Sequence, residues 1–251
     1  LLYISYRKYS DKSIFRLEEE KMKLELCVAS KKALEMAKKF QLDRVELCQN
    51  LEVGGLTPSP GLIEISLELE LNTHVLIRPR IGGFVYSNDE KEWMLRDIQA
   101  CKEMGVHGVV LGVLNEEAYL DIPFLRKAQE MSGNMELTFH RAFDDIQNWR
   151  QAIMDLKDIG FKRILTSGLA STVEVGMNNI PFLKTETRGM LELMIGGGVN
   201  PKNISKILQT CQPDSMHFSA TNLVVDESNS KFNAPRLEVD EQKLTEILSR
   251  L

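Results

Sequence analysis

The sequence has no apolar stretch long enough to cross a membrane and too few cysteines for a disulfide framework. None of its runs approaches the roughly 20 apolar residues that a membrane-spanning helix needs. The 251 residues include four widely spaced cysteines, which favours a reducing, cytoplasmic setting. A net charge of -5 argues against a general nucleic-acid or membrane binder.

Several diagnostic motifs are also missing. No G-x-G-x-x-G follows the first predicted strand, which argues against a dinucleotide-binding open sheet. Neither C-x-x-C nor H-x-x-x-H occurs, so the spacing does not favour zinc. Residues 1–21 mix apolar and charged residues without the apolar segment of a signal peptide. We expect them to be an N-terminal extension outside the folded domain, with Met22 as the natural start.

From residue 22 onward, segments with strand-like alternation are each followed by a helical pattern. Alternation of this kind predicts parallel strands with right-handed crossovers, and eight such units close into a (β/α)8 TIM barrel. We therefore expect one domain over 22–251, with a long, polar loop over about 220–239 that is mobile over 222–239, and a last helix over about 240–251. The rival is an open doubly wound sheet. The predicted strands are 24–28, 44–48, 74–78, 108–113, 136–140, 162–167, 191–195 and 214–218.

Alternation also predicts which side chains face the barrel interior. The apolar residues of each alternating strand should pack under the helices, so the polar residues between them should face the interior. That set comprises Glu25, Cys27, Glu46, Cys48, Arg78, Glu136, Thr138 and His140. Buried charge is costly unless it is paired or solvated by a ligand. We expect an ion-pair network of Glu25 and Glu46 with Arg78 and Arg80, together with a site at the C-terminal ends of the strands.

Cys27 and Cys48 end two similar Glu-Leu-Cys segments on consecutive strands. Neighbouring parallel strands lie about 4.8 Å apart, so two inward thiols at similar height can meet and would suit Cu(I). Cysteine is also often buried as a small hydrophobe. From spacing alone, the buried-core interpretation is favoured over a metal site.

A second group of residues indicates an anion site. Gly196, Gly197 and Gly198 follow the seventh predicted strand and precede a helix expected to open at Asn200. Loops after strands seven and eight often bind phosphate in such barrels. The other candidates are the forked donors Arg78, Arg80 and Arg141 and the hydroxyls of Ser167 and Ser219. His140, Glu25 and Glu46 are the candidate acids and bases if the protein is an enzyme.

Taken together, these motifs resemble the copper homeostasis CutC proteins over about residues 22–220. The matching stretches include Arg44-Val45-Glu46-Leu47-Cys48, Ile77-Arg78-Pro79-Arg80, Thr138-Phe139-His140-Arg141-Ala142-Phe143-Asp144 and Gly196-Gly197-Gly198-Val199. The resemblance implies a TIM barrel, cytoplasmic location, homo-oligomers and copper handling, with the proposed copper ligands matching Cys27 and Cys48. Where the family has Gly-Gly-Asp-Phe, this chain has Ile81-Gly82-Gly83-Phe84, so no role of that acid carries over.

Three functions therefore stay open. The first is a cytoplasmic protein that binds Cu(I) through Cys27 and Cys48, and this hypothesis rests mainly on the resemblance. The second is an enzyme of unnamed reaction that acts on a small anionic or phosphorylated substrate. The residues themselves favour this second function, because two thiols do not need four surrounding charges. The third is an oligomeric scaffold with a vestigial site.

Overall fold

The computed structural model describes residues 22–225, 231 and 234–251, and the predicted N-terminal extension lies outside them. Eight parallel strands close into a barrel in chain order, and β1 pairs with β8. The predicted TIM barrel is therefore confirmed, and the open sheet is excluded. The strands are β1 (Lys23–Val28), β2 (Arg44–Leu47), β3 (Thr73–Leu76), β4 (Gly108–Leu111), β5 (Glu136–Phe139), β6 (Arg163–Thr166), β7 (Glu192–Ile195) and β8 (Ser215–Phe218).

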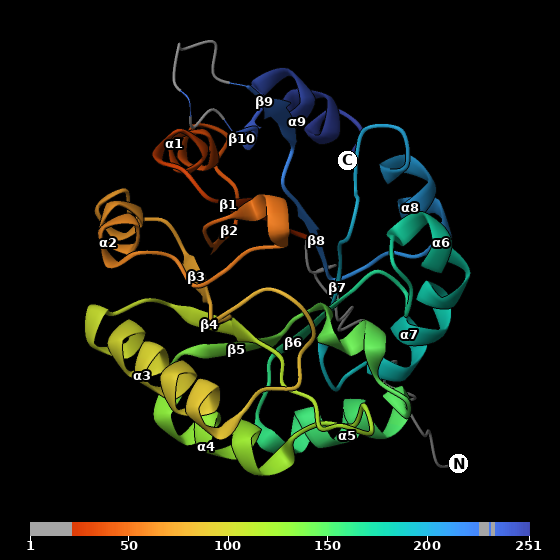
Figure 1. The fold of residues 1–251 in the computed structure, drawn as a ribbon. Helices are drawn as coiled ribbons and strands as arrows, with labels where there is room; N and C mark the ends of the chain where they lie inside the picture. Colours follow the sequence, from red (N-terminus) through yellow and green to blue (C-terminus); the bar gives the residue numbers. More distant parts are fainter. Residues whose placement is uncertain (1–21, 226–230, 232–233) are drawn as a thin grey trace, which may run out of the picture.

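Helices surround this ring of strands, as Figure 1 shows. Their beginnings follow local capping chemistry. The Ser30 hydroxyl accepts the N–H of Ala33, and Ser87 and Glu90 form a reciprocal capping box. Pro181 lies in the first turn of α7, where proline is tolerated. The helices are α1 (Lys31–Lys39), α2 (Pro60–Glu68), α3 (Asn88–Met104), α4 (Ile122–Ser132), α5 (Trp149–Ile159), α6 (Val173–Gly176), α7 (Ile180–Thr187), α8 (Ile204–Thr210) and α9 (Glu241–Leu248).

The apolar core lies mainly between the strands and the helices, as the predicted parity requires. Leu26 and Val28 of β1 belong to this outer core. Besides a small apolar cluster of Cys27, Cys48, Leu76 and Val110, the described part of the barrel interior holds the buried side chains of Leu165 and Met194. The rest of the interior is polar, so its stability depends on how charges are paired.

Two short strands lie within the segment for which the sequence predicts a long, mobile loop. They are β9 (Thr221–Val224) and β10 (Arg236–Val239), which pair antiparallel. This hairpin packs beside α1, where Glu238 accepts a hydrogen bond from the Ser30 hydroxyl at 2.7 Å (Figure 1). No helix in the described part of the chain is both long and apolar enough to span a membrane.

Candidate functional site

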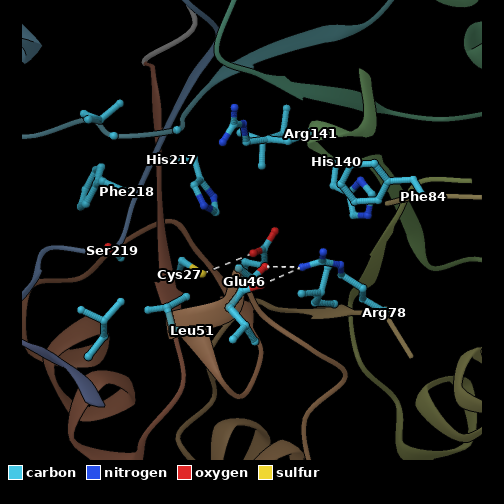
Figure 2. A pocket seen from close by; sticks show the side chains of 18 residues that line it. Cys27, Glu46, Leu51, Arg78, Phe84, His140, Arg141, His217, Phe218 and Ser219 are labelled. Atoms are coloured by element: carbon cyan, nitrogen blue, oxygen red, sulfur yellow. Dashed lines mark hydrogen bonds between the residues drawn. The ribbon is translucent and has the colours of Figure 1, made fainter. Parts of the chain in front are cut away.

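A cavity of about 460 Å³ opens at the C-terminal ends of the barrel strands. Side chains from β1, β2, β8 and the loops after β3, β5 and β7 surround it, and Leu237 of the hairpin completes one wall (Figure 2). This is the end of the barrel where the sequence predicts the site.

Cys27 forms part of the cavity wall, and Cys48 lies directly behind it. Their sulfur atoms are 3.8 Å apart, and the Cys27 thiol donates to Oε1 of Glu46 at 3.3 Å. Cys48 is fully buried, and an added Cβ at Gly55 would lie 3.4 Å from its Sγ. The hydrogen bond with Cys48, burial and the nearby Glu46 carboxyl raise the pKa of the Cys27 thiol well above its usual value. Cys27 is therefore a thiol when no metal is bound.

His217 of β8 lies beside this thiol pair. Its ligand nitrogen, the Cys27 sulfur and a Glu46 oxygen lie within 4.8 Å of one another, and Figure 2 shows the three side chains converging. Nδ1 of His217 is 2.7 Å from Oε1 of Glu25. Burial raises the pKa of Glu25, but Arg44 and His217 outweigh this effect and keep it a carboxylate. A carboxylate only accepts, so Nδ1 carries the proton and Nε2 is the nitrogen left to face the cavity.

His140 lies on another wall of the cavity and is neutral. Burial, followed by the charge of Arg78, lowers the pKa of its imidazole to about 3. Nδ1 accepts the N–H of Ala142 at 3.1 Å, so the proton of the neutral ring is on Nε2. Within the described chain this buried Nε2 has no hydrogen-bond partner. The ring of Phe84 packs against it with centroids 4.8 Å apart, so its orientation is fixed.

The two arginines of the Arg-Pro-Arg segment do not make the predicted ion pairs. Nη1 of Arg78 donates to carbonyls of the loop at 53–55, and Nη2 donates to Gly82 at 2.8 Å. Arg80 pairs with Glu90 at the start of α3 and does not line the cavity. The expected network with Glu25 and Glu46 is therefore wrong. Arg78 stays a candidate for ligand binding because its buried Nε is unpaired in the described structure.

Arg141 lies at the cavity mouth and is held by Asp144. Its Nε donates to Asp144 at 3.0 Å, and its Nη2 donates to the Ser167 hydroxyl at 2.8 Å. Asp144 also accepts the N–H of Ser167, so one carboxylate fixes both the arginine and the loop after β6. Gly197 packs on this assembly, because an added Cβ would lie 2.9 Å from Cζ of Arg141.

The glycine loop does not lead straight into a helix. Helix α8 begins at Ile204, and the N–H of Asn200 donates to Oδ1 of Asn203 at 2.8 Å. The prediction that a helix begins at Asn200 is therefore wrong, because the helix begins four residues later. Gly197, Gly198 and Ser219 still line the cavity.

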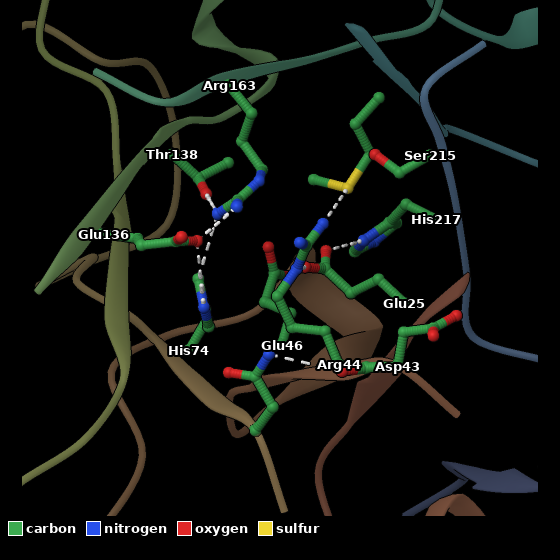
Figure 3. Close-up of polar contacts among 12 residues, drawn as sticks. Glu25, Asp43, Arg44, Glu46, His74, Glu136, Thr138, Arg163, Ser215 and His217 are labelled. Carbon is green, nitrogen blue, oxygen red and sulfur yellow. Dashed lines mark hydrogen bonds and ion pairs between the residues drawn. The ribbon is translucent and has the colours of Figure 1, made fainter. Parts of the chain in front are cut away.

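An ion network lies in the barrel interior below the cavity (Figure 3). Arg44 pairs with Glu25 and Glu192, and Arg163 pairs with Glu136 and Glu192. Both arginine side chains are at most 2% exposed. The sequence indicated that the interior is charged but not that these two arginines pair with its acids. Arg44 shares the parity of Glu46, so alternation alone could have identified it.

The predicted site residues thus separate into two groups. Those that line the cavity are Cys27, Glu46, Arg78, His140, Arg141, Gly197, Gly198 and Ser219. Those that stand behind it or away from it are Cys48, Glu25, Arg80 and Ser167. Glu25 does not line the cavity, and its carboxylate contacts His217 behind the wall. The predicted site residues did not include Phe84 and His217, which line the cavity, or Asp144, which holds Arg141 at its mouth.

The chain matches the model of the CutC family over residues 22–222. It belongs to the CutC family. A CutC family protein of Glaesserella parasuis is 40% identical over 200 residues, which cover 79% of this chain and 82% of the relative. A CutC family protein of Bacteroides thetaiotaomicron is 36% identical over 214 residues, which cover 84% and 86% of the two chains.

Solved structures agree with this assignment. A CutC protein of Streptococcus agalactiae, described with a proposed role in copper homeostasis, superimposes with a TM-score of 0.73 and 32% identity. The match covers 78% of this chain and 97% of that protein. Phosphoribosylanthranilate isomerase of Thermotoga maritima is similar with a TM-score of 0.56 at 15% identity, over 91% of this chain and 97% of the isomerase. That second likeness shows the fold alone. The CutC family thus provides the starting point for function.

Proposed function

We propose that this protein binds Cu(I) as its cargo through Cys27 and Cys48. The observation that carries the proposal is the pair of buried sulfur atoms 3.8 Å apart, one of which faces an open cavity. Thiolates are soft ligands that select Cu(I). The described cysteines are unpaired thiols, as a reducing, cytoplasmic setting requires. The role in copper homeostasis proposed for the Streptococcus agalactiae protein agrees with this function.

The raised pKa of Cys27 affects how the metal binds. Cu(I) binds thiolate, so it has to displace the thiol proton, which makes the apparent affinity rise with pH. Cys27 supplies the sulfur that the ion reaches first, because Cys48 is shielded by Gly55.

Titration of the reduced protein with Cu(I) against a competing chelator tests this function. We expect tight binding that is lost in both Cys27→Ser and Cys48→Ser. Cys211→Ser is the matched control, because Cys211 is buried at the end of α8 and away from the cavity. Binding that survives both site substitutions would make the pair ordinary core residues.

A second function is favoured by the unpaired polar atoms around the cavity. In the described chain, buried Oε2 of Glu46, Nε of Arg78 and Nε2 of His140 have no hydrogen-bond partner, and all three residues line this cavity. Buried polar atoms without partners are costly, so they indicate a missing ligand. A small oxyanion or carbonyl compound would accept from Arg78 and from the neutral His140. Such binding is the first requirement of an enzyme, and the reaction stays unnamed.

Thermal-shift titration with phosphate, sulfate and small carboxylates tests this second function. We expect a saturable rise in the melting temperature with at least one of these anions, and its loss in His140→Leu. The matched control is His107→Gln, because His107 is exposed at the opposite end of the barrel. An identical response of His140→Leu and wild type would remove His140 from the site.

A further inference from the structure

The spacing of the two sulfur atoms limits the geometry of any ion that they share. Two thiolates bound to one tetrahedral ion at about 2.3 Å lie about 3.8 Å apart, whereas a linear ion would separate them by about 4.6 Å. The sulfurs of Cys27 and Cys48 are 3.8 Å apart. A bent S–metal–S angle leaves the ion open on the side away from the two sulfurs. The observed spacing thus matches a bent site with room for a further ligand better than a linear one.

Two further side chains with possible ligand atoms, His217 and Glu46, lie beside Cys27. A ligand nitrogen of His217 and the Cys27 sulfur both belong to the group of atoms that lie within 4.8 Å of one another. His217 lines the cavity, and because Nδ1 is engaged with Glu25, Nε2 is the ring nitrogen available to an ion. The third member of the group is a Glu46 oxygen. Cu(I) prefers sulfur and imidazole nitrogen to carboxylate oxygen, so the imidazole is the better third ligand.

The contact between His217 and Glu25 has the form that metal-binding histidines require. A ligating histidine donates its other ring N–H to a carboxylate or carbonyl, which fixes the tautomer and raises the basicity of the ligating nitrogen. Here Nδ1 donates to Oε1 of Glu25 at 2.7 Å. Glu25 is fully buried and is itself held by Arg44, its register partner on β2. Glu25 thus orients the histidine, and Arg44 in turn holds Glu25.

We propose that His217 is the third ligand of the metal site, with Glu25 as its positioning residue. The bound ion is then coordinated by Sγ of Cys27, Sγ of Cys48 and Nε2 of His217. This assignment rests on the proposed Cu(I) function and deepens it, because it adds strand β8 to a site otherwise built from β1 and the end of β2. Ion binding then ties the first and last strands of the barrel to each other.

X-ray absorption at the copper edge of the Cu(I)-loaded, reduced wild-type protein tests the assignment without any substitution. We expect two sulfur ligands and one nitrogen ligand with the outer-shell scattering of an imidazole ring. A shell of two sulfurs without nitrogen would overturn the role of His217 while leaving the Cu(I) function standing. Failure of the wild-type protein to bind Cu(I) would overturn the proposed function and the ligand assignment together.

Substitution of His217 provides a second test of the ligand assignment. Removing a ligand should lower the Cu(I) affinity of His217→Leu by at least about 10-fold, a loss of the size seen even for partners of metal ligands. His107→Gln, which removes an exposed histidine at the other end of the barrel, should retain wild-type affinity. Circular dichroism of each variant shows whether it is folded. A folded His217→Leu with unchanged affinity would refute the assignment.

Ring nitrogen NMR separates positioning by Glu25 from a merely structural role. Cu(I) has a filled d shell and is diamagnetic, so histidine side-chain spectra of the loaded protein are readable. We expect Nε2 of His217 to shift on loading while Nδ1 keeps a slowly exchanging proton. In folded Glu25→Gln, that proton should exchange faster and the affinity should fall about 10- to 100-fold. Unchanged exchange and affinity would remove Glu25 from the site.

Discussion

Glu25 of β1 and Arg44 of β2 are register partners, and their side chains form an ion pair inside the barrel. The arginine side chain is 2% exposed and the glutamate is fully buried. Arg44 reaches Glu192 of β7 as well, at 3.4 Å, so one guanidinium joins three strands of the ring. The same glutamate holds His217, which connects the interior network to the wall of the cavity.

We predict that Arg44→Met lowers the free energy of unfolding by about 3–5 kcal/mol, because it leaves two acids without their shared cation. Among the described residues, Glu25 then keeps His217 as its one side-chain partner while fully buried. Urea unfolding followed by circular dichroism measures the change. Lys38→Met is the control, since the Lys38–Glu70 pair is exposed and such pairs contribute about 1 kcal/mol or less. Equal losses in the two variants would show that the interior network contributes no more than a surface pair.

His140 makes stability depend on pH in a predictable direction. Its pKa is about 3 in the folded protein against 6.5 for the free side chain. Between these values the unfolded chain binds one more proton than the folded chain, so stability is lost as the pH falls. The slope is about 1.4 kcal/mol per pH unit for one proton.

We therefore predict that His140→Gln flattens the pH profile of stability below pH 6.5. Urea midpoints measured from pH 7.5 to pH 4.5 for both proteins give the difference in slope. Other acids titrate in both proteins and cancel in this comparison. Parallel profiles would mean that the imidazole is protonated in the folded state.

Alternating apolar residues and helix caps were enough to predict the barrel. All eight strands form close to the predicted segments, because parallel strands covered by helices need one apolar face. The hairpin of β9 and β10 escaped prediction. Most of β9 is exposed, so its residues carry little hydrophobic pattern, and their pairing joins positions separated by a polar segment.

The sequence locates the candidate site but does not show which of its side chains pair with one another. Parity placed Cys27, Glu46 and His140 on the inner face, and they meet in one cavity. The pairing partners could not be read from parity, because parity does not give the register between strands: Arg163 pairs with Glu192, its register partner on β7, and Arg44 of β2 reaches the same acid. Nor does the sequence reveal that the Arg78 guanidinium donates its hydrogen bonds to loop carbonyls.

The hairpin offers a direct test of order in the segment after β8. The N–H of Asp240 donates to the carbonyl of Ala220 at 2.9 Å, and Lys32 donates to the carbonyl of Val239. We predict that the Asp240 amide exchanges slowly in hydrogen-exchange mass spectrometry or NMR, since closed hydrogen bonds retard exchange. Exchange at the rate of a free peptide would show that the hairpin opens readily.

Gly197 tests whether the loop after β7 holds Arg141 in place. It has φ of +84°, and an added Cβ would meet Arg141 and Ser167 at 2.9 Å. Gly189 has φ of +72° but open space around it, so it is a matched control. Both alanine variants should lose about 1–2 kcal/mol from backbone strain. Only Gly197→Ala should also weaken phosphate or sulfate binding, measured by thermal shift. Equal anion binding in the two variants would separate this loop from the anion site.

The Arg141→Ala variant tests whether an anion and Cu(I) bind at one shared site in the cavity or at two separate sites. Arg141 borders the cavity and donates to Asp144 and Ser167, whereas the thiols of Cys27 and Cys48 lie on β1 and at the end of β2. We predict that Arg141→Ala abolishes sulfate and phosphate binding and leaves Cu(I) affinity within about 3-fold of wild type, because neither sulfur contacts the guanidinium. Calorimetry with sulfate and chelator competition with Cu(I) measure the two affinities on the same preparation. If a folded variant lost both, anion and metal would share one site, and the anion would then act as part of the metal's own coordination environment.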